Sequence, residues 1–202
     1  MNSKKPEKNE LLYRLGYEEF SRCGYKNASL NSIIKKAGIS KGSFYYHFNG
    51  KEDFYLFLVT RALEKKKKIL REVTSRKGKS GNIFDKLALQ TEALIEYAFS
   101  NKIMYDFSRS FSGEKGNEIY ERVLSSHTND INARFEEMIS SANEKAELRE
   151  DLPEDFLVKS FKYYFMNLNS LLEAFGSLDD KDELQRYCLY FIETLKNGFE
   201  NG

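Results

Sequence analysis

Hydrophobic residues recur at intervals of three and four positions along most of the chain. This spacing places apolar side chains on one face of an α-helix, as in helices that pack against a core. The first such stripe, in a helix predicted over residues 9–23, consists of Leu12, Leu15, Gly16, Phe20 and Cys23. The same spacing later predicts helices near residues 82–101, 102–112, 116–145, 154–175 and 181–200. Because no alternation of Val, Ile and Thr indicates a β-strand, the pattern predicts an all-α protein.

The N-terminal quarter of the chain is predicted to contain short helices separated by glycines. Gly24 ends the first helix, because glycine readily adopts the backbone conformation found just past a helix C-terminus. Ser29 is a good N-cap for a second helix, and Gly38 ends that helix. Ser40 can cap a third, short helix over about residues 41–47.

The second and third predicted helices are joined by a short turn that contains Gly38, which is the pattern of a helix-turn-helix. In such a motif the second helix enters the major groove of DNA with its N-terminal residues at the base edges. Lys41 could reach a guanine edge or a phosphate, and the small Gly42 and Ser43 permit a close approach of the backbone. The candidates for DNA contacts are Ser29, Ser40, Lys41, Gly42, Ser43, Tyr45, Tyr46, His47 and Lys51.

Several of these candidates have two interpretations. Phe44 and Phe48 are four positions apart and are expected to hold the reading helix against the first two helices. Tyr45 and Tyr46 could contact thymine methyl groups and phosphates, or they could simply pack inside the protein. His47 could donate to a phosphate oxygen or be an ordinary surface residue. Lys51 could clamp a phosphate together with free N–H groups at a helix N-terminus, or be a solvated side chain.

Charge is distributed unevenly along the chain. Residues 1–80 hold 19 Lys and Arg against 8 Asp and Glu, a net charge of +11. Residues 81–202 hold 13 Lys and Arg against 23 Asp and Glu, a net charge of −10. The N-terminal part therefore suits a polyanion such as nucleic acid. The alternative is that the basic side chains only keep helix faces in solvent.

Composition and motifs argue against several other classes of protein. No stretch of about 18 apolar residues predicts a membrane span, and the N-terminus lacks the apolar run of a signal peptide, so we expect a cytoplasmic protein. Cys23 and Cys188 are the only cysteines, and they make neither a zinc site nor a disulfide framework. The sequence has no glycine-rich phosphate loop, metal-binding constellation or catalytic triad order. We therefore expect no enzyme, no catalytic residues and no bound metal or cofactor.

The stretch ASLNSIIKKAGISKGSFYYHFNGKEDF resembles the DNA-binding signature of TetR-family transcriptional regulators. Phe20 and Gly24 match the Phe and Gly that precede this signature, so that the resemblance covers about residues 12–58. Two positions depart from it, because Ala28 stands where threonine is usual and Ile34 where a small alanine is usual. The matching positions are Ser29, Leu30, Ile33, Ala37, Gly38, Ser40, Lys41, Gly42, Tyr45, His47, Phe48, Lys51 and Glu52.

The resemblance implies a homodimer whose copies have about nine helices each. Residues 1–54 would form a three-helix helix-turn-helix DNA-binding domain, and residues 55–202 would form a helical ligand-binding and dimerisation domain. Two copies would read a palindromic operator in double-stranded DNA, and a small molecule in the C-terminal domain would release them. We expect a repressor controlled by an apolar or aromatic ligand of unknown identity. The alternative is a TetR-like DNA-binding protein without such a ligand, acting as an adaptor or a division-site factor.

Two long apolar helices near the C-terminus suit a dimeric four-helix bundle. Their apolar stripes consist of Phe161, Phe165, Leu168, Leu172 and Phe175 in one helix and Leu184, Cys188, Phe191, Leu195 and Phe199 in the other. All of these except Phe175 and Phe199 are candidates for the dimer interface. The alternative is that the stripes form the core of the single chain.

Candidates for the ligand pocket come mainly from the middle helices. They are Tyr97, Met104, Tyr105, Arg109, Tyr120, His127, Tyr163 and Tyr164. Arg109 lies among aromatic residues in the stretch IMYDFSRSF, where it could hold a ligand carboxylate, pair with a nearby acid or lie at the surface. Core packing is the alternative for the aromatic residues, because aromatic stripes at helical spacing are more often core than pocket. We expect a largely apolar, aromatic-rich pocket.

Overall fold

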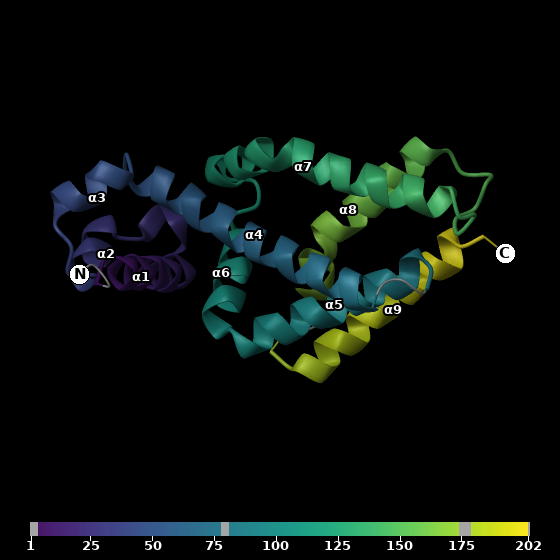
Figure 1. Ribbon diagram of the computed structural model, residues 1–202, viewed down its shortest axis with the longest axis horizontal. Helices are drawn as coiled ribbons and strands as arrows, with labels where there is room; N and C mark the ends of the chain where they lie inside the picture. The colour runs from purple at the N-terminus through teal and green to yellow at the C-terminus, as the bar shows by residue number, and fades with distance from the viewer. Residues whose placement is uncertain (1–3, 78–80, 174–178, 202) are drawn as a thin grey trace. The chain divides into compact units, whose positions relative to one another are not determined.

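The computed structural model describes residues 4–77, 81–173 and 179–201 of the chain (Figure 1). Within these ranges there are nine α-helices, and the only extended pairing is an isolated bridge between Leu148 and Glu200. The helices are α1 (Lys4–Asn27), α2 (Leu30–Lys36), α3 (Lys41–His47), α4 (Lys51–Lys77), α5 (Ile83–Ser100), α6 (Lys102–Gly113), α7 (Glu118–Asn143), α8 (Glu154–Glu173) and α9 (Lys181–Phe199). The structure therefore confirms the prediction of an all-α protein with about nine helices.

The chain forms two compact units, each built from two separate segments. The N-terminal unit consists of Met1–Lys66 and Ser100–Ser126, and the C-terminal unit consists of Lys67–Phe99 and His127–Gly202. The helices α4 and α7 each contribute residues to both units. The N-terminal unit therefore combines the helix-turn-helix region with α6. The expected functional boundary after residue 54 stays a prediction.

Aromatic side chains form much of the core of the N-terminal unit. Phe20 and Tyr55 are fully buried and meet edge to face, with ring centroids 4.8 Å apart. The helices α1 and α4 approach closely at Gly16, where a Cβ atom would lie 2.7 Å from the Leu58 side chain. Phe107 of α6 is also buried, and its ring centroid lies 5.8 Å from that of Tyr55. The α6 helix thus belongs to the same core as α1 and α4.

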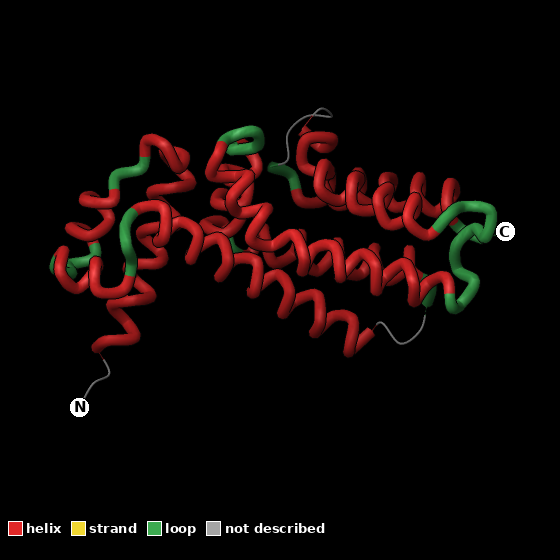
Figure 2. Tube along the Cα trace, turned by 90° about the horizontal axis from the view of Figure 1, so that it is seen from above, coloured by secondary structure: helices red, strands yellow, loops and turns green. Residues whose placement is uncertain are grey.

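The C-terminal unit has a separate core built by α5, α7, α8 and α9. Its fully buried side chains include Ile139, Leu157 and Phe161. Loops connect successive helices along the described part of the chain (Figure 2). No helix within the described ranges is long and apolar enough to cross a membrane.

Candidate nucleic-acid interface

The helix-turn-helix is built by two short helices that are each capped by a serine. Ser29 precedes α2, and its Oγ accepts a hydrogen bond from the backbone N–H of Ser32 at 3.3 Å. Ser40 precedes α3, and its Oγ accepts from the backbone N–H of Ser43 at 3.0 Å. Between the helices, Gly38 has a φ of 63°, a conformation that favours glycine. Both predicted caps and the predicted glycine turn are therefore confirmed.

The α3 helix has one buried side and one exposed side. Phe44 and Phe48 are buried, and their ring centroids lie 5.4 and 4.9 Å from that of Phe54 in α4. By contrast, Tyr45 is 52% exposed and Tyr46 is 85% exposed. The exposed residues of α3 are Lys41, Gly42, Ser43, Tyr45, Tyr46 and His47. The aromatic anchors thus leave a row of basic, small and tyrosyl side chains at the surface.

Lys51 is tied to residues 25–29, which follow the break in α1 at Gly24 and lead into α2, and which we call the α1–α2 connection. Its Nζ donates hydrogen bonds to the carbonyl oxygens of Lys26 at 2.9 Å and Ala28 at 3.3 Å. The same ammonium lies 5.0 Å above the centre of the Tyr25 ring, a cation–π distance. Because an ammonium has three N–H donors, the predicted phosphate contact of Lys51 would depend on its third donor. That contact stays a prediction, whereas the support of the backbone is a role that sequence reasoning missed.

A buried glutamate of α1 holds the beginning of α2. Glu19 is 5% exposed, and its Oε1 accepts from the backbone N–H of Ser29 at 3.1 Å. Its other oxygen accepts from the Arg22 guanidinium at 2.8 Å. The hydrogen bond from Arg22 holds the pKa of the Glu19 carboxyl below its ordinary value. The buried carboxylate is therefore ionised and partnered at the entry to the helix-turn-helix.

A second buried glutamate reaches the same connection from a distant part of the sequence. The α1 helix is interrupted at Gly24, where φ is 69° and ψ is 170°. The backbone N–H of the next residue, Tyr25, donates to Oε1 of Glu114 at 2.7 Å. Glu114 follows α6, 89 residues further along the chain, so no local motif could have indicated this contact. The predicted stop at Gly24 is confirmed as a break in the helical backbone.

The two departures from the TetR signature both lie in the core. Ala28 and Ile34 are buried, so the larger isoleucine is accommodated inside the N-terminal unit. Sequence reasoning also passed over three exposed lysines near the motif, namely Lys26, Lys35 and Lys36. Their charges extend the basic character of this region beyond α3.

The eight candidates for ligand contacts fall in both units. The N-terminal unit contains Met104, Tyr105, Arg109 and Tyr120. The C-terminal unit contains Tyr97, His127, Tyr163 and Tyr164. Tyr120 is buried and stacks on Phe111 with ring centroids 5.0 Å apart, whereas Tyr163 is 67% exposed. Neither unit by itself brings the eight residues together, so their role in ligand binding stays a prediction.

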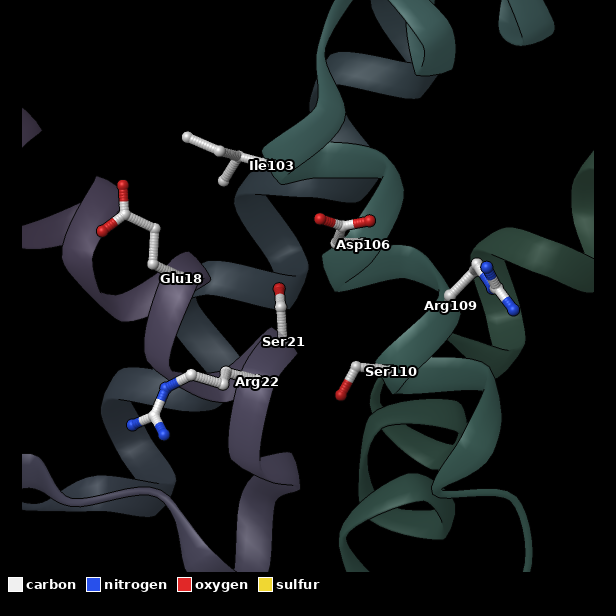
Figure 3. A pocket seen from close by; sticks show the side chains of 7 residues that line it. All are labelled: Glu18, Ser21, Arg22, Ile103, Asp106, Arg109 and Ser110. Atoms are coloured by element: carbon white, nitrogen blue, oxygen red, sulfur yellow. The ribbon is translucent and has the colours of Figure 1, made fainter. Parts of the chain in front are cut away.

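A groove of about 500 Å³ lies between α1 and α6 within the N-terminal unit (Figure 3). It is lined by Glu18, Ser21, Arg22, Ile103, Asp106, Arg109 and Ser110. Of the predicted ligand residues only Arg109 lines it, and its guanidinium points away from α1. That guanidinium lies 5.8 Å from the centre of the Tyr105 ring, and Asp106 is paired with Lys102 at 2.9 Å. Six of its seven lining residues carry a polar group and none is aromatic, whereas the pocket expected from the sequence is apolar and aromatic-rich.

The apolar stripes of α8 and α9 lie largely in the core of the chain itself. Phe161, Leu172, Leu184, Cys188 and Leu195 are buried, and Phe165, Leu168, Phe191 and Phe199 are partly buried against the same clusters. Burial raises the pKa of the Cys188 thiol to about 11. Phe175 lies outside the described residues. The core alternative therefore accounts for these side chains, and their place in a dimer interface stays a prediction.

Other large apolar side chains of α8 and α9 are exposed. They are Phe156, Tyr163 and Tyr164 of α8 and Leu189 and Tyr190 of α9. Each of the two helices thus has an inward face and an outward face. The spacing of apolar residues in the sequence indicated the inward face of each helix but not these exposed apolar side chains.

Comparisons with known proteins agree with this architecture. The family model described as "Bacterial regulatory proteins, tetR family" matches residues 12–57. The uncharacterized HTH-type transcriptional regulator YwcC of Bacillus subtilis is 33% identical over 114 residues, which cover 52% of this chain and 51% of YwcC. The chain spans about half, or less, of the length of the curated relatives that it matches first.

Solved structures extend the similarity over nearly the whole fold. A TetR family transcriptional regulator from Chloroflexus aurantiacus has a TM-score of 0.67 at 23% identity, with 99% of this chain and 96% of that chain covered. The fatty acid degradation regulator FadR from Bacillus halodurans has a TM-score of 0.67 at 16% identity, with 91% of this chain and 97% of that chain covered. At such low identity these structures show a shared fold alone.

Proposed function

Because the chain belongs to the tetR family of bacterial regulatory proteins, we propose that it is a DNA-binding transcriptional regulator that reads its operator with α3. The observation that carries this proposal is the division of α3 into a buried aromatic side and an exposed side. Relatives with these motifs are transcriptional regulators, and the expectation that the chain is not an enzyme agrees with that class. A cytoplasmic location would follow from this role.

The exposed side of α3 suits both base reading and phosphate contacts. Lys41 and Ser43 lie in the first turn, where a reading helix meets base edges. Gly42 adds no side chain between them, so the backbone can approach the groove closely. Tyr46 and His47 follow, with ring centroids 5.0 Å apart, and their hydroxyl and imidazole groups can donate to phosphate oxygens.

A homodimer on a palindromic operator is the arrangement that we propose for DNA binding. Two copies related by a two-fold axis would place two α3 helices at half-sites about one helical turn apart. The outward faces of α8 and α9 are the surface that we assign to dimerisation, because they expose several large apolar side chains. Within this surface Tyr163 and Tyr190 are 67% and 61% exposed.

The regulator that we propose is a repressor released by a small apolar or aromatic ligand. One protein of the same fold, 16% identical to this chain, is named as a regulator of fatty acid degradation. The alternative is a regulator without an effector, serving as an adaptor or a division-site factor. Native mass spectrometry of the purified dimer would separate the two, because a ligand-responsive repressor would carry or take up a small molecule that weakens DNA binding. A protein that never does so would favour the alternative.

DNase footprinting on the DNA upstream of the protein's own operon tests the DNA-binding proposal. We expect protection of two inverted half-sites at nanomolar protein, as for typical specific binders. We also expect binding to weaken steeply with salt, because several phosphates are neutralised in each half-site. A uniform footprint on every DNA at all salt concentrations would contradict sequence-specific reading.

A further inference from the structure

Charged side chains from three different elements hold the short connection between α1 and α2. Glu19 of α1 accepts from the backbone N–H of Ser29, and Lys51 of α4 donates to backbone carbonyl oxygens within residues 26–28. Glu114, just after α6, accepts from the backbone N–H of Tyr25. The connection leads directly into α2, so these contacts fix where the helix-turn-helix begins. Only Glu114 among them lies outside the first four helices.

The Glu114 carboxylate is firmly held in place. The side chain is 9% exposed, and its second oxygen accepts from Nδ2 of Asn117 at 2.7 Å. Opposite it, Gly24 has no side chain, and a Cβ atom there would lie only 3.0 Å from Oε1. The glycine thus leaves room for the carboxylate to reach the backbone N–H of Tyr25 at 2.7 Å. A charge-assisted hydrogen bond of this kind is about twice as strong as a neutral one.

The turn that carries Glu114 is itself fixed to the N-terminal unit. Before the turn, the Ser110 hydroxyl of α6 donates to the backbone carbonyl of Phe20 in α1 at 3.0 Å. After the turn, the Arg122 guanidinium of α7 donates to Glu52 of α4 at 2.5 Å. Glu114 lies between these anchors, at the junction of α6 and α7. Glu114 therefore joins this junction directly to the backbone of the α1–α2 connection.

We propose that Glu114 is a positioning residue for DNA reading, because its carboxylate holds the α1–α2 connection in the conformation that aligns α2 and α3 with the major groove. The proposal rests on the DNA-binding function proposed above. It assigns the junction of α6 and α7 an indirect part in DNA recognition, because no residue of that junction would touch DNA. The residue acts through the backbone of Tyr25, and so its loss should affect the fit to a specific sequence more than general attraction to DNA.

The test compares Glu114→Ala, Glu114→Gln and the control Glu121→Ala, which removes an exposed carboxylate of α7. Fluorescence anisotropy measures the affinity of each full-length variant for operator DNA and for an unrelated duplex of equal length. Hydrogen exchange of the Tyr25 amide reports the contact itself. We expect Glu114→Ala to lower the ratio of specific to non-specific affinity about tenfold, since a buried charged acceptor is lost. Glu114→Gln should retain more of the ratio because its amide oxygen can still accept, and the control should retain all of it.

The outcomes separate this proposal from the one on which it rests. A wild-type protein that does not distinguish operator from unrelated DNA would overturn the DNA-reading function and the role of Glu114 with it. A wild-type protein that does distinguish them, together with a Glu114→Ala variant that distinguishes them equally well, would overturn only the role of Glu114. If Glu114→Ala is too unstable to assay, faster Tyr25 exchange together with an unchanged ratio in Glu114→Gln, relative to a Glu121→Gln control, would also overturn it. A loss of both affinities in equal proportion would indicate a merely structural role and contradict the proposal.

Discussion

Neighbouring residues of α3 differ sharply in what surrounds them. Phe44 is almost completely buried against Phe54, while the next residue, Tyr45, has half of its surface in solvent. Tyr46 is exposed almost entirely. The four-residue interval between Phe44 and Phe48 was sufficient to predict the buried side, because residues four apart share one face of a helix. Stability is thus expected to depend on the buried side of this seven-residue helix, and the recognition that we propose on its exposed side.

The two sides of α3 should respond differently to truncation. Phe44→Ala should cost about 3–5 kcal/mol of unfolding free energy, as for other buried phenylalanines. Tyr46→Ala should change it by no more than about 0.5 kcal/mol, because the ring is mostly in solvent. The same Tyr46 variant should nevertheless bind operator DNA more weakly. Urea unfolding and fluorescence anisotropy on both variants check this division, and equal stability losses would contradict it.

Glu19 should contribute stability that depends on pH. Its pKa is lowered in the folded protein, chiefly by the hydrogen bond from Arg22, so the ionised form is favoured by folding. The contribution is therefore complete above the ordinary pKa of 4.5 and is lost as the pH falls through the lowered value. Urea unfolding across the acid range should show a shallower decline for Glu19→Gln than for wild type. If the unfolding free energy of the two proteins declined equally at low pH, Glu19 would not be a cause of that decline.

At the scale of elements, the ends of the short helices are fixed by two kinds of contact. The caps by Ser29 and Ser40 are local, since each serine bonds to an N–H three residues ahead, and the sequence therefore predicted them. The contacts of Glu19 and Glu114 join residues 10 and 89 positions apart, and no local pattern encodes such pairs. The sequence could therefore predict where α2 and α3 begin, but not what holds them in place.

The cap of α3 offers a direct test at this scale. Ser40→Ala removes the acceptor for the Ser43 N–H and should cost about 1 kcal/mol of unfolding free energy. Ser40→Asp keeps a good capping side chain and should cost much less. Urea unfolding of the two variants measures the difference. If both variants were as stable as wild type, the cap would not contribute to folding.

At the scale of the whole molecule, hydrophobic periodicity predicted the helices of the C-terminal unit but not the use of each face. The stripes that include Phe161 in α8 and Cys188 in α9 were candidates for a dimer interface or for the core of the single chain, and the structure buries both residues within the chain. Periodicity marks any apolar face, whether it packs on its own chain or on another. The exposed Leu189 and Tyr190 follow Cys188 directly, so they lie on the other side of the same helix.

Charge introduced into the outward face of α9 should prevent association. The double substitution Leu189→Glu and Tyr190→Glu should convert the expected dimer to a monomer in analytical ultracentrifugation, because two charges would be buried at the interface. The control is Lys145→Glu, which changes an exposed residue that lies outside both α8 and α9. This variant should leave the dimer intact. A wild-type monomer, or a double variant that remains dimeric, would contradict the assignment of this face.

The central claim is that α3 reads DNA sequence, and the ratio of operator affinity to non-specific affinity tests it most directly. Lys41→Ala and Tyr45→Ala change exposed residues of α3, and Lys145→Ala removes a matched positive charge from the C-terminal unit. Wild type and Lys145→Ala should prefer operator DNA by at least about a thousandfold. Each α3 variant should lose about tenfold or more of this preference with its unfolding free energy nearly unchanged. An unchanged preference in both α3 variants would contradict the claim.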